Sequence, residues 1–567
     1  YLPYLIIQEG CIAMDGLDDI EDLFKDSSID IASNNFRPVK LHKKREKKLL
    51  KTVEESRNDK ALGDYFQETG QIPGTQSIFI KTWGCTHNTS DSEFMAGLLA
   101  SYGYRIIDDK MKADLWILNS CTVKNPAEDH LRNEIDSAKS EGKYVVVAGC
   151  VSQAAPHSSY LHKTSLVGVQ QIDRIVEVVE ETLKGSSVRL LGNKKVNGVK
   201  QGGAPLTLPK IRRNPLIEII PISTGCLNHC TYCKTKHARG ELGSYPIDAI
   251  VERAIQAFEE GVCELWVTSE DTGAYGRDIG TNLPELLQRL VKEIPEGSMM
   301  RLGMTNPPYI LDHMEAMAEI LNHPKVYSFL HIPVQSGSDC VLGDMKREYT
   351  SKDFCNLVDY LRKHVPNINI VTDIICGFPT ESEKDFQDSL DLCDRYRFAS
   401  LYINQFYPRP GTPAANMTRI NTMEVKRRTK QLTNFFQSYQ PYDGRVGKEY
   451  DVLITEVAHD NIHLVGHNKF YEQILIPLDK SHLGTRTRVK IVSFGRHFMV
   501  GEVIRNIERA SVTAPLPSGK VSGLDNFLAL HGFKISDNKS HWLPLSFIVL
   551  ISALLIRWIC FIWQNKI

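Results

Sequence analysis

The sequence has almost no net charge, few cysteines for its length and only one long apolar run. Its 67 lysine and arginine residues balance 68 aspartate and glutamate residues, and the formal charge of −1 gives no electrostatic reason to expect a nucleic-acid-binding protein. Thirteen cysteines among 567 residues are too few, and odd in number, for a disulfide scaffold. With 42% apolar and 24% charged residues, the chain is neither collagenous, nor largely disordered, nor a multi-span membrane protein. At about 150 residues per domain, the length predicts three to four domains.

The first 75 residues show no sustained apolar period and are expected to be mostly disordered. An acidic stretch at 9–30 precedes a basic one at 37–51, which is either a solvated tail or a weak RNA or localisation contact. Residues 1–13 lack the basic region that begins a signal peptide, and Met14 is an alternative start. Without a secretory route, we expect the cysteines to stay reduced.

Two stretches alternate apolar strands with helices. In 76–184 the strands are continuously apolar, which predicts a parallel sheet covered on both faces. A linker is expected at 185–214. In 215–440, six strand–helix units favour a barrel or partial barrel, with its site at the carboxyl ends of the strands. The expected strands are 77–81, 114–120, 144–149 and 165–169 in the first stretch, and 216–222, 263–269, 299–304, 326–334, 368–378 and 399–407 in the second.

After residue 440 the strand–helix alternation ends, and the remaining chain contains short strands, a polar segment and the long apolar run. Short strands separated by turn residues predict a small all-β barrel over 441–505, followed by a polar linker at 506–541. Residues 542–563 would span about 33 Å as a helix, which is enough to cross a bilayer. Arg557 near one end can reach the interface, and a buried terminal helix is the alternative. The predicted fold class is therefore α/β: an open parallel α/β domain, a partial (βα)6 barrel, an all-β barrel and a C-terminal transmembrane helix.

Three cysteines each follow an expected strand of the first stretch. Cys85 lies in TWGC, Cys121 in NSC and Cys150 in AGC. Ligands bind at the carboxyl edge of an open parallel sheet, so the three thiols could converge in one crevice. Soft thiolates suit zinc or an iron–sulfur cluster, and three unrelated buried cysteines are the alternative. Zinc usually takes a fourth ligand, whereas a cluster held by three cysteines keeps one iron open.

A second cysteine group opens the second stretch. Cys226, Cys230 and Cys233 form C-x3-C-x2-C in STGCLNHCTYCKTKHARG, directly after the first expected barrel strand. This spacing can curl a loop so that three thiolates bind one small cluster. Tyr232 precedes the last cysteine. A zinc loop with a nearby histidine as fourth ligand is the alternative.

The second motif, its tyrosine and the six strand–helix units resemble the radical S-adenosylmethionine (SAM) superfamily. The order of parts is similar to that of tRNA methylthiotransferases, which have an N-terminal three-cysteine domain, a radical SAM barrel and a TRAM β-barrel. The resemblance covers about residues 76–505. It is carried by both cysteine triads and by NSCTVKNPAE, TGCLNHCTYCKTKHARG, TSEDTGAYGRDIGTNLP and HIPVQSGSD. TSEDTGAYG and the C-terminal anchor are similar to the threonylcarbamoyladenosine branch of eukaryotes and archaea.

The resemblance implies both the cofactors and the reaction. It implies SAM and two [4Fe-4S] clusters, a radical SAM cluster on the second triad and an auxiliary cluster on the first that carries the inserted sulfur. The adenine C2–H bond is not acidic, so acid–base catalysis cannot replace that hydrogen, whereas a radical can. The cofactor supplies this chemistry and the protein orients it. The implied product is 2-methylthio-N6-threonylcarbamoyladenosine at position 37 of tRNA.

Other site residues are assigned by analogy, because strand ends favour function over surface structure. The expected SAM-binding residues are Tyr232, Ser269, Glu270, Asp271, Gln335, Arg347, Asp373, Gly377 and Glu381. RNA contacts are expected from basic stretches and from β-barrel aromatics, which could instead be solvated or core residues. The basic residues are Lys210, Arg212, Arg213, Lys234, Lys236, Arg239, Lys480, Arg486, Arg488, Lys490, Arg496 and Arg505, and the aromatics are Phe470, Tyr471, Phe494 and Phe498.

The expected partners are the tRNA anticodon loop, a membrane, a one-electron donor protein and a sulfur source. The short anchor favours the endoplasmic reticulum membrane, with the catalytic domains facing the cytosol. Two alternatives remain. Methylthiolation of N6-isopentenyladenosine belongs to a branch that would more naturally carry an organelle transit peptide. An inactive membrane-bound RNA-binding scaffold would need neither cysteine triad.

Overall fold

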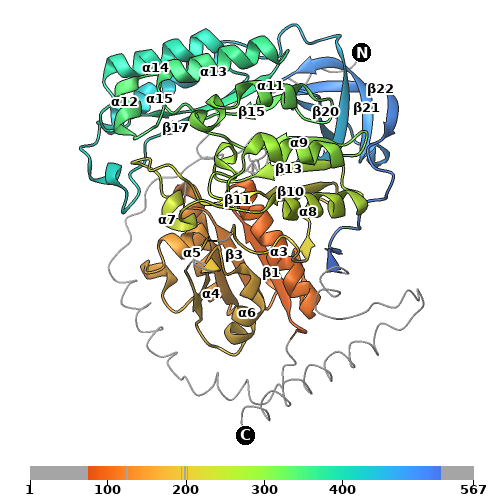
Figure 1. The fold of residues 1–567 in the computed structure, drawn as a ribbon. Coiled ribbons are helices and arrows are strands. Elements are labelled where there is room, and N and C mark those ends of the chain that lie inside the picture. Colours follow the sequence, from red (N-terminus) through yellow and green to blue (C-terminus); the bar gives the residue numbers. More distant parts are fainter. Residues whose placement is uncertain (1–73, 123–124, 193–194, 197–198, 201, 525–567) are drawn as a thin grey trace, which may run out of the picture. The chain divides into compact units, whose positions relative to one another are not determined.

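The computed structural model describes residues 74–122, 125–192, 195–196, 199–200 and 202–524. Within them, it confirms the α/β class with an open parallel sheet, a partial barrel of parallel strands and a closed β-barrel (Figure 1). No helix in this part of the chain has an apolar stretch of the length that a membrane crossing requires. The expected anchor at 542–563 and residues 1–73 of the expected N-terminal segment lie outside the described residues.

The N-terminal domain is built on a six-stranded parallel sheet in the order β2-β1-β3-β4-β5-β6. The central strands β3 (Leu115–Ser120) and β4 (Tyr144–Gly149) are almost wholly buried, as continuous apolar runs require. Helices α3 (Thr86–Tyr102) and α6 (Ile175–Leu183) pack against each other, and α4 (Asn125–Ser140) packs against β3 and β4. The remaining elements are β1 (Ser77–Thr82), β2 (Arg105–Ile106), β5 (Ser165–Val167), β6 (Arg189–Leu190) and α5 (Cys150–Ala154).

The central domain arranges six parallel strands in two three-stranded sheets. A backbone bridge between Met300 and Val326 and a hydrogen bond from the Thr305 amide to the His331 carbonyl connect the two sheets. In the described part of the chain, β17 does not pair with β10, so the barrel is partial. The strands are β10 (Ile217–Pro221), β13 (Glu264–Thr268) and β14 (Met299–Leu302), then β15 (Phe329–His331), β16 (Asn369–Cys376) and β17 (Ser400–Gln405). The helices are α7 (Thr235–Arg239), α8 (Ile247–Glu259), α9 (Leu283–Glu293), α10 (Pro307–Leu311), α11 (Met314–Asn322), α12 (Asp339–Asp344), α13 (Ser351–His364), α14 (Glu383–Tyr396) and α15 (Thr422–Gln437).

Side-chain caps define where three barrel helices begin. Asn282 accepts a hydrogen bond from the first turn of α9. Thr350 and Asp353 form a capping box at α13, and Ser382 and Asp385 form one at α14. Because each helix follows a strand of the partial barrel, these caps fix the turns along the edge where the site is expected.

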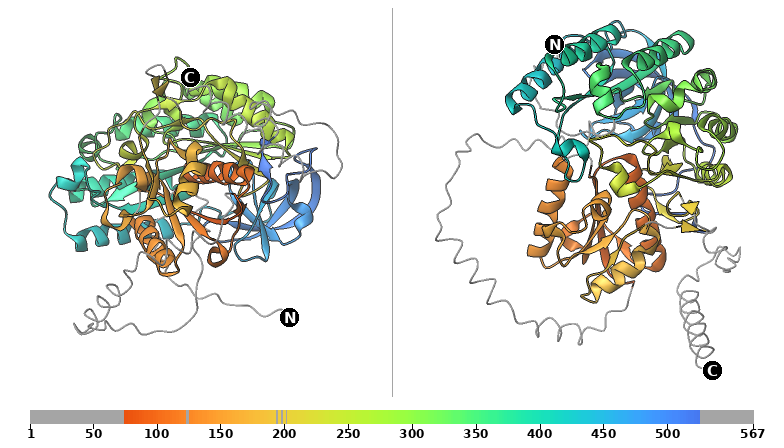
Figure 2. Two further views of the ribbon diagram at one scale, coloured as in Figure 1. Left: turned by 90° about the horizontal axis from the view of Figure 1, so that it is seen from below. Right: turned by 60° about the vertical axis from the view of Figure 1, so that its left-hand side comes forward.

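The third domain is a closed barrel in the order β18-β19-β20-β22-β21. Figure 2 shows its strands in blue from two further directions. The inward-facing residues Val452, Ile454, Leu464 and Ile474 belong to one apolar core. The strands are β18 (Glu449–Val457), β19 (His463–His467), β20 (Gln473–Pro477), β21 (Thr485–Phe494) and β22 (Met499–Arg509).

The two segments that the sequence predicted as linkers are partly structured. β9 (Lys210–Ile211), in the first linker, pairs antiparallel with β23 (Val521–Ser522), in the second. The Ser522 hydroxyl accepts hydrogen bonds from Arg212 and Arg253 at 3.0 and 3.1 Å. The chain therefore returns from the β-barrel to the start of the central domain, a contact between residues too distant in sequence for a local pattern to reveal.

Candidate functional site

The three N-terminal cysteines lie at the carboxyl ends of three neighbouring strands, as the sequence predicted. Cys85 is the N-cap of α3 after β1, Cys121 directly follows β3, and Cys150 is the first residue of α5 after β4. The order of the sheet makes β1, β3 and β4 adjacent. Gly84 lets these loops approach each other, because a Cβ at this position would lie 2.5 Å from that of Cys121.

The thiols of this first triad influence one another. Burial raises the pKa of Cys85 above its ordinary value. A hydrogen bond with Cys121 lowers the pKa of Cys150 to about 7, and the nearby charge of Arg239 also lowers it, whereas burial raises it. The Cys150 thiol lies 3.7 Å from the side-chain oxygen of Asn88. A lowered pKa favours the thiolate, which is the form that binds metals.

The second triad lies in the loop that follows β10 and the short strand β11 (Ser223–Thr224). The loop is closed by a backbone hydrogen bond from Cys226 to Gly240. The sulfur atoms of Cys226, Cys230 and Cys233 accept hydrogen bonds from Asn228 at 3.6 Å, from Arg347 at 3.0 Å and from the Thr235 amide at 3.4 Å, in that order. Burial raises the pKa of Cys226 and Cys230, and these donors favour the thiolates.

A buried polar network joins this loop to the ends of β13 and β14. Asp271 accepts hydrogen bonds from Asn306, through its amide at 3.1 Å and its side chain at 2.7 Å, and from Asn228 at 3.2 Å. Arg347 donates to Asn306, and Tyr309 donates to Asn228 at 3.1 Å. Burial raises the pKa of Asp271 to about 6, although the bonds from Asn306 lower it. The sequence reasoning missed Asn228, Asn306 and Tyr309; the place of Asn228 between two cysteines was the available signal.

Two other expected site residues lie side by side: Gln335 follows β15, and Asp373 lies within β16 rather than after it. The Gln335 amide donates to the Asp373 carbonyl at 2.8 Å, and the Asp373 carboxylate lies 2.5 Å from His331. Gln335 has φ +70°, a left-handed conformation that residues other than glycine rarely adopt, so the local backbone is strained. Ser269 accepts a hydrogen bond from the amide two residues later at 3.1 Å, and Tyr232 packs against an apolar cluster.

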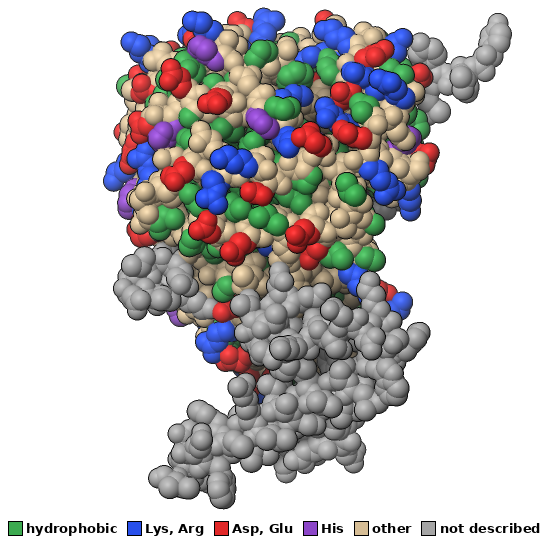
Figure 3. All heavy atoms as spheres, turned by 45° about the vertical axis from the view of Figure 1, so that its right-hand side comes forward, with side chains coloured by type: hydrophobic (Ala, Val, Ile, Leu, Met, Phe, Trp, Pro, Cys, Tyr) green, Lys and Arg blue, Asp and Glu red, His purple; other side chains and the backbone are tan. Residues whose placement is uncertain are grey.

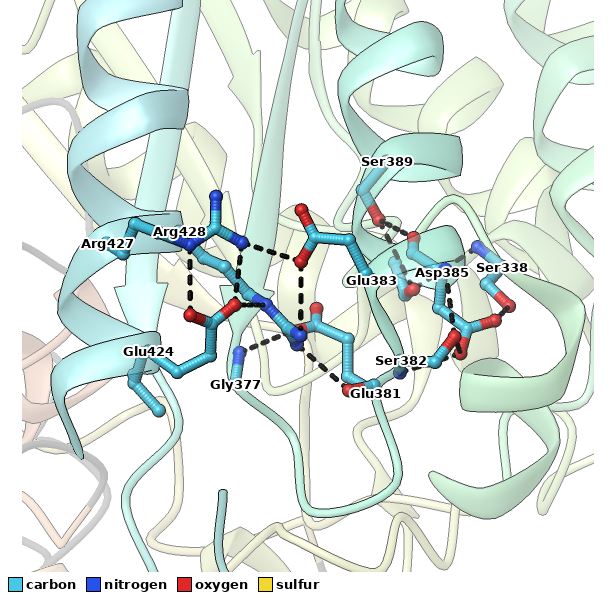
Figure 4. A network of polar contacts seen from close by, with 12 residues as sticks. Ser338, Gly377, Glu381, Ser382, Glu383, Asp385, Ser389, Glu424, Arg427 and Arg428 are labelled. Carbon is cyan, nitrogen blue, oxygen red and sulfur yellow. Dashed lines mark hydrogen bonds and ion pairs between the residues drawn. The ribbon is translucent and has the colours of Figure 1, made fainter. Parts of the chain in front are cut away.

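The carboxylates of two expected SAM-binding residues are engaged by other parts of the protein. Glu381 accepts hydrogen bonds from the Gly377 amide and from Arg428 of α15, both at 2.7 Å (Figure 4). This pair ties the turn after β16 to α15. Glu270 contacts the N-terminal domain, where it lies 2.8 Å from His87. Arg428 and His87 are remote in sequence from the carboxylates that they contact, so the strand-end pattern could not reveal these two contacts.

Three of the six basic residues expected to contact RNA before residue 241 are buried, and that prediction was wrong for them. Lys210, Arg212 and Arg239 are 0%, 4% and 1% exposed because each is paired with carboxylates inside the protein. Tyr471 is also buried, with its ring stacked on His467. Figure 3 shows acidic and basic side chains interspersed over one face of the molecule. The charge is therefore mixed on that face.

The donor sets of the two triads fit iron–sulfur clusters. In the described residues, no group of three or more Cys, His, Asp or Glu side chains is arranged to hold a metal ion. The fit depends instead on chemistry and placement: each site offers three soft thiols at strand ends, and Cys230 faces the cationic Arg347. Such sites suit a cluster that keeps one iron open.

Comparison with known families supports the same assignment. Residues 77–168 match the description "Uncharacterized protein family UPF0004", and residues 220–393 match the radical SAM superfamily. These segments carry the first and second triads, respectively. The fold and its second cysteine site define a radical SAM enzyme.

Two relatives named "Threonylcarbamoyladenosine tRNA methylthiotransferase" match most of the chain. The protein of Drosophila melanogaster is 64% identical over 79% of this chain and 82% of its own, and that of Homo sapiens is 58% identical over 90% and 87%. The chain belongs to the threonylcarbamoyladenosine tRNA methylthiotransferase family, and its cofactors are SAM and [4Fe-4S] clusters. A solved structure, the radical SAM methyltransferase TsrM of Kitasatospora setae, is 15% identical, with a TM-score of 0.44 over 60% of this chain and 74% of its own.

Proposed function

We propose that this protein replaces the C2 hydrogen of N6-threonylcarbamoyladenosine at position 37 of tRNA with a methylthio group. The product would be 2-methylthio-N6-threonylcarbamoyladenosine, which supports accurate codon reading. The observation that carries the proposal is the presence of two three-cysteine sites at the strand ends of two contacting α/β domains. One site suits the start of radical chemistry and the other suits storage of the inserted sulfur, so a scaffold or a simple methyltransferase would not need both.

We assign one cluster to each triad. The radical SAM ligands are Cys226, Cys230 and Cys233, and the auxiliary ligands are Cys85, Cys121 and Cys150. When bound, the radical SAM cluster supplies the electron that cleaves SAM and so starts hydrogen removal. Glu270 and Asp271 are both expected to bind the methionine part of SAM, and the carboxylates of both are engaged by protein groups, so neither is favoured over the other. Arg347 holds the cysteine loop through its bond to Cys230.

RNA binding would fall to the basic residues that remain at the surface. Arg213, Lys480, Lys490 and Arg505 are exposed and could contact phosphates, which makes binding dependent on salt. We further propose that the segment at 542–563 anchors the protein in the endoplasmic reticulum membrane and leaves the catalytic domains in the cytosol. A one-electron donor protein and a sulfur source complete the set of partners.

The test uses single cysteine variants of the anaerobically purified protein. Cys226→Ala should abolish SAM cleavage, because the radical SAM cluster loses a ligand. Cys85→Ala should still cleave SAM but form no thiolated nucleoside. Cys393→Ala is the matched control, since this thiol is buried but belongs to neither triad. Iron and sulfide analysis should find two clusters; zinc in their place, or equal activity in all three variants, would contradict the proposal.

Nucleoside mass spectrometry separates the proposed product from the alternative one. Purified protein, incubated with tRNA that carries N6-threonylcarbamoyladenosine, should form 2-methylthio-N6-threonylcarbamoyladenosine. Formation of 2-methylthio-N6-isopentenyladenosine alone would instead assign the protein to the other branch.

A further inference from the structure

A buried charged cluster, which we call the bridge, connects the two cysteine sites. It consists of His87, Asp91, Arg239 and Glu270, whose side chains are 4%, 7%, 1% and 7% exposed. His87 and Asp91 lie on α3 of the N-terminal domain, whereas Arg239 ends α7 and Glu270 follows β13. Charged side chains are rarely buried this completely unless they are paired. The proposed function so far gives Arg239, His87 and Asp91 no role.

Glu270 is the end of the bridge nearest the radical SAM cysteines. One carboxylate oxygen accepts a hydrogen bond from the Gly225 amide at 2.9 Å, and Gly225 directly precedes Cys226. The other oxygen lies 2.8 Å from His87 and 3.3 Å from Arg239. Although burial raises its pKa, these two partners hold the pKa of Glu270 at about 2, so the carboxylate stays charged.

Arg239 is the residue that reaches into the N-terminal domain. One terminal nitrogen of its guanidinium donates to Asn88 and to Asp91, both at 2.7 Å. Asn88 lies three residues after Cys85, and its side-chain oxygen is also in contact with the Cys150 thiol. Arg239 itself belongs to the radical SAM loop, which closes on the neighbouring Gly240. A single side chain thus links the loop of one triad to the helix that begins at the other.

The proposed reaction requires the two cysteine sites to be held at a defined distance, which this link can do. Sulfur held at the auxiliary site must meet a carbon atom activated at the radical SAM site, so the distance between the sites has to be set. A misplacement of about 1 Å can cost about 100-fold in rate. A second interdomain contact, between Thr86 and Thr268 at 2.8 Å, lies at the same junction but carries no charge. The guanidinium also lies close to the auxiliary thiols, because the side-chain oxygen of Asn88 is 2.7 Å from the guanidinium and 3.7 Å from the Cys150 thiol.

We propose that Arg239 and Glu270 are positioning residues that hold the auxiliary cysteine site in register with the radical SAM site, and that Arg239 places its positive charge against the auxiliary thiolates. The positioning role rests on the proposed function. The charge role does not, because it concerns the auxiliary site alone. A positive charge beside a cluster favours its reduced form, so removing this charge should make the reduction potential more negative.

The experiment compares three arginine variants. Arg239→Gln removes the charge, and Arg239→Lys keeps the charge but cannot reach α3 and Glu270 together. Arg253→Gln is the matched control, because Arg253 is also 1% exposed and paired, with Glu218 at 3.0 Å, but contacts neither cysteine loop. Each variant is made in the full chain and in a background in which Cys226, Cys230 and Cys233 are replaced by alanine. In that background the measured iron and redox signals come from the auxiliary cluster alone.

The first readout is the iron content of the auxiliary cluster and its midpoint potential. Electron paramagnetic resonance monitors the reduction of the cluster in the titration. Arg239→Gln should have a more negative potential than the unsubstituted background, Arg239→Lys should restore it, and Arg253→Gln should leave it unchanged. If Arg239→Gln fails to assemble the cluster, recovery of iron in Arg239→Lys supports the charge role. Equal loss of iron in all three variants, or an unchanged potential in Arg239→Gln, overturns it.

The second readout is thiolated nucleoside formed per SAM cleaved in the full chain. This ratio should fall at least tenfold in Arg239→Gln and stay low in Arg239→Lys, while Arg253→Gln keeps the ratio of the unsubstituted protein. Equal ratios in Arg239→Gln and Arg253→Gln would overturn the positioning role. Failure of the unsubstituted protein to thiolate tRNA would instead refute the proposed function, and the potential measurement would still test the charge role.

Discussion

Replacing Glu218 with glutamine should destabilise the protein strongly, because this carboxylate is the shared partner of three buried cations. Glu218 is fully buried on β10. Its oxygens lie 3.1 Å from Lys210, 2.5 Å from Arg212 and 3.0 Å from Arg253. Burial raises the pKa of the carboxyl, but the three cations lower it far below its ordinary value.

The size of the effect follows from what remains after the substitution. Lys210 keeps an ion pair with Glu93 at 3.4 Å, and Arg212 keeps one with Glu260 at 2.6 Å. Arg253 loses the carboxylate that it contacts. One buried charge is then uncompensated, which costs about 3–5 kcal/mol. For a domain of the size of 215–440, the free energy converts at about 2–4 °C per kcal/mol, so the midpoint of its unfolding should fall by about 6–20 °C.

Thermal and urea unfolding at pH 7, followed by tryptophan fluorescence, measure this difference. Glu177→Gln is the control, because its pair with Arg174 is exposed and worth less than about 1 kcal/mol. The folded pKa of Glu218 lies below the unfolded value, so its contribution is present above a pH of about 4.3 and is lost as the pH falls. The difference in the free energy of unfolding between the variant and the unsubstituted protein should therefore become smaller as the pH falls below about 4.3. A loss below about 1 kcal/mol at pH 7, with no such narrowing, would refute the reasoning.

Three further outcomes are expected. Arg428→Ala should cost about 3–5 kcal/mol in urea unfolding, because it leaves the buried carboxylate of Glu381 without its cation; a loss no larger than that of an exposed pair would contradict this. Tyr471→Ala should destabilise the protein by about 3–5 kcal/mol, because its ring is buried against Tyr327; an unchanged midpoint would show that the ring is dispensable to the core. Lys490→Gln should reduce by about 1 the slope of log affinity for tRNA against log salt, measured by filter binding; an unchanged slope would remove Lys490 from the RNA surface.

The cysteine sites were largely predictable because their logic is local. Each N-terminal cysteine follows an apolar run, and parallel strands place their carboxyl ends along one edge of a sheet. That β1, β3 and β4 are neighbours follows from the order of strands in the sheet, which the sequence of an individual strand does not reveal. The second triad needed only the spacing from Cys226 to Cys233 within one loop.

What the sequence could not reveal are the partners of charged side chains. Lys210 and Arg239 are indistinguishable from surface residues until the carboxylates around them are known. One signal was available: Glu218 lies inside an apolar strand, and a buried acid requires a cation. Glu270 shows the same limit, because its place after a strand predicts a ligand-facing residue, whereas its contacts direct it to the N-terminal domain.

The central claim is tested most directly by mass spectrometry of tRNA nucleosides from cells with and without this protein. Cells that lack it should lose 2-methylthio-N6-threonylcarbamoyladenosine and accumulate N6-threonylcarbamoyladenosine. The unsubstituted protein should restore the modification, whereas Cys226→Ala should not. An undiminished level of the methylthio nucleoside in the deficient cells would contradict the account.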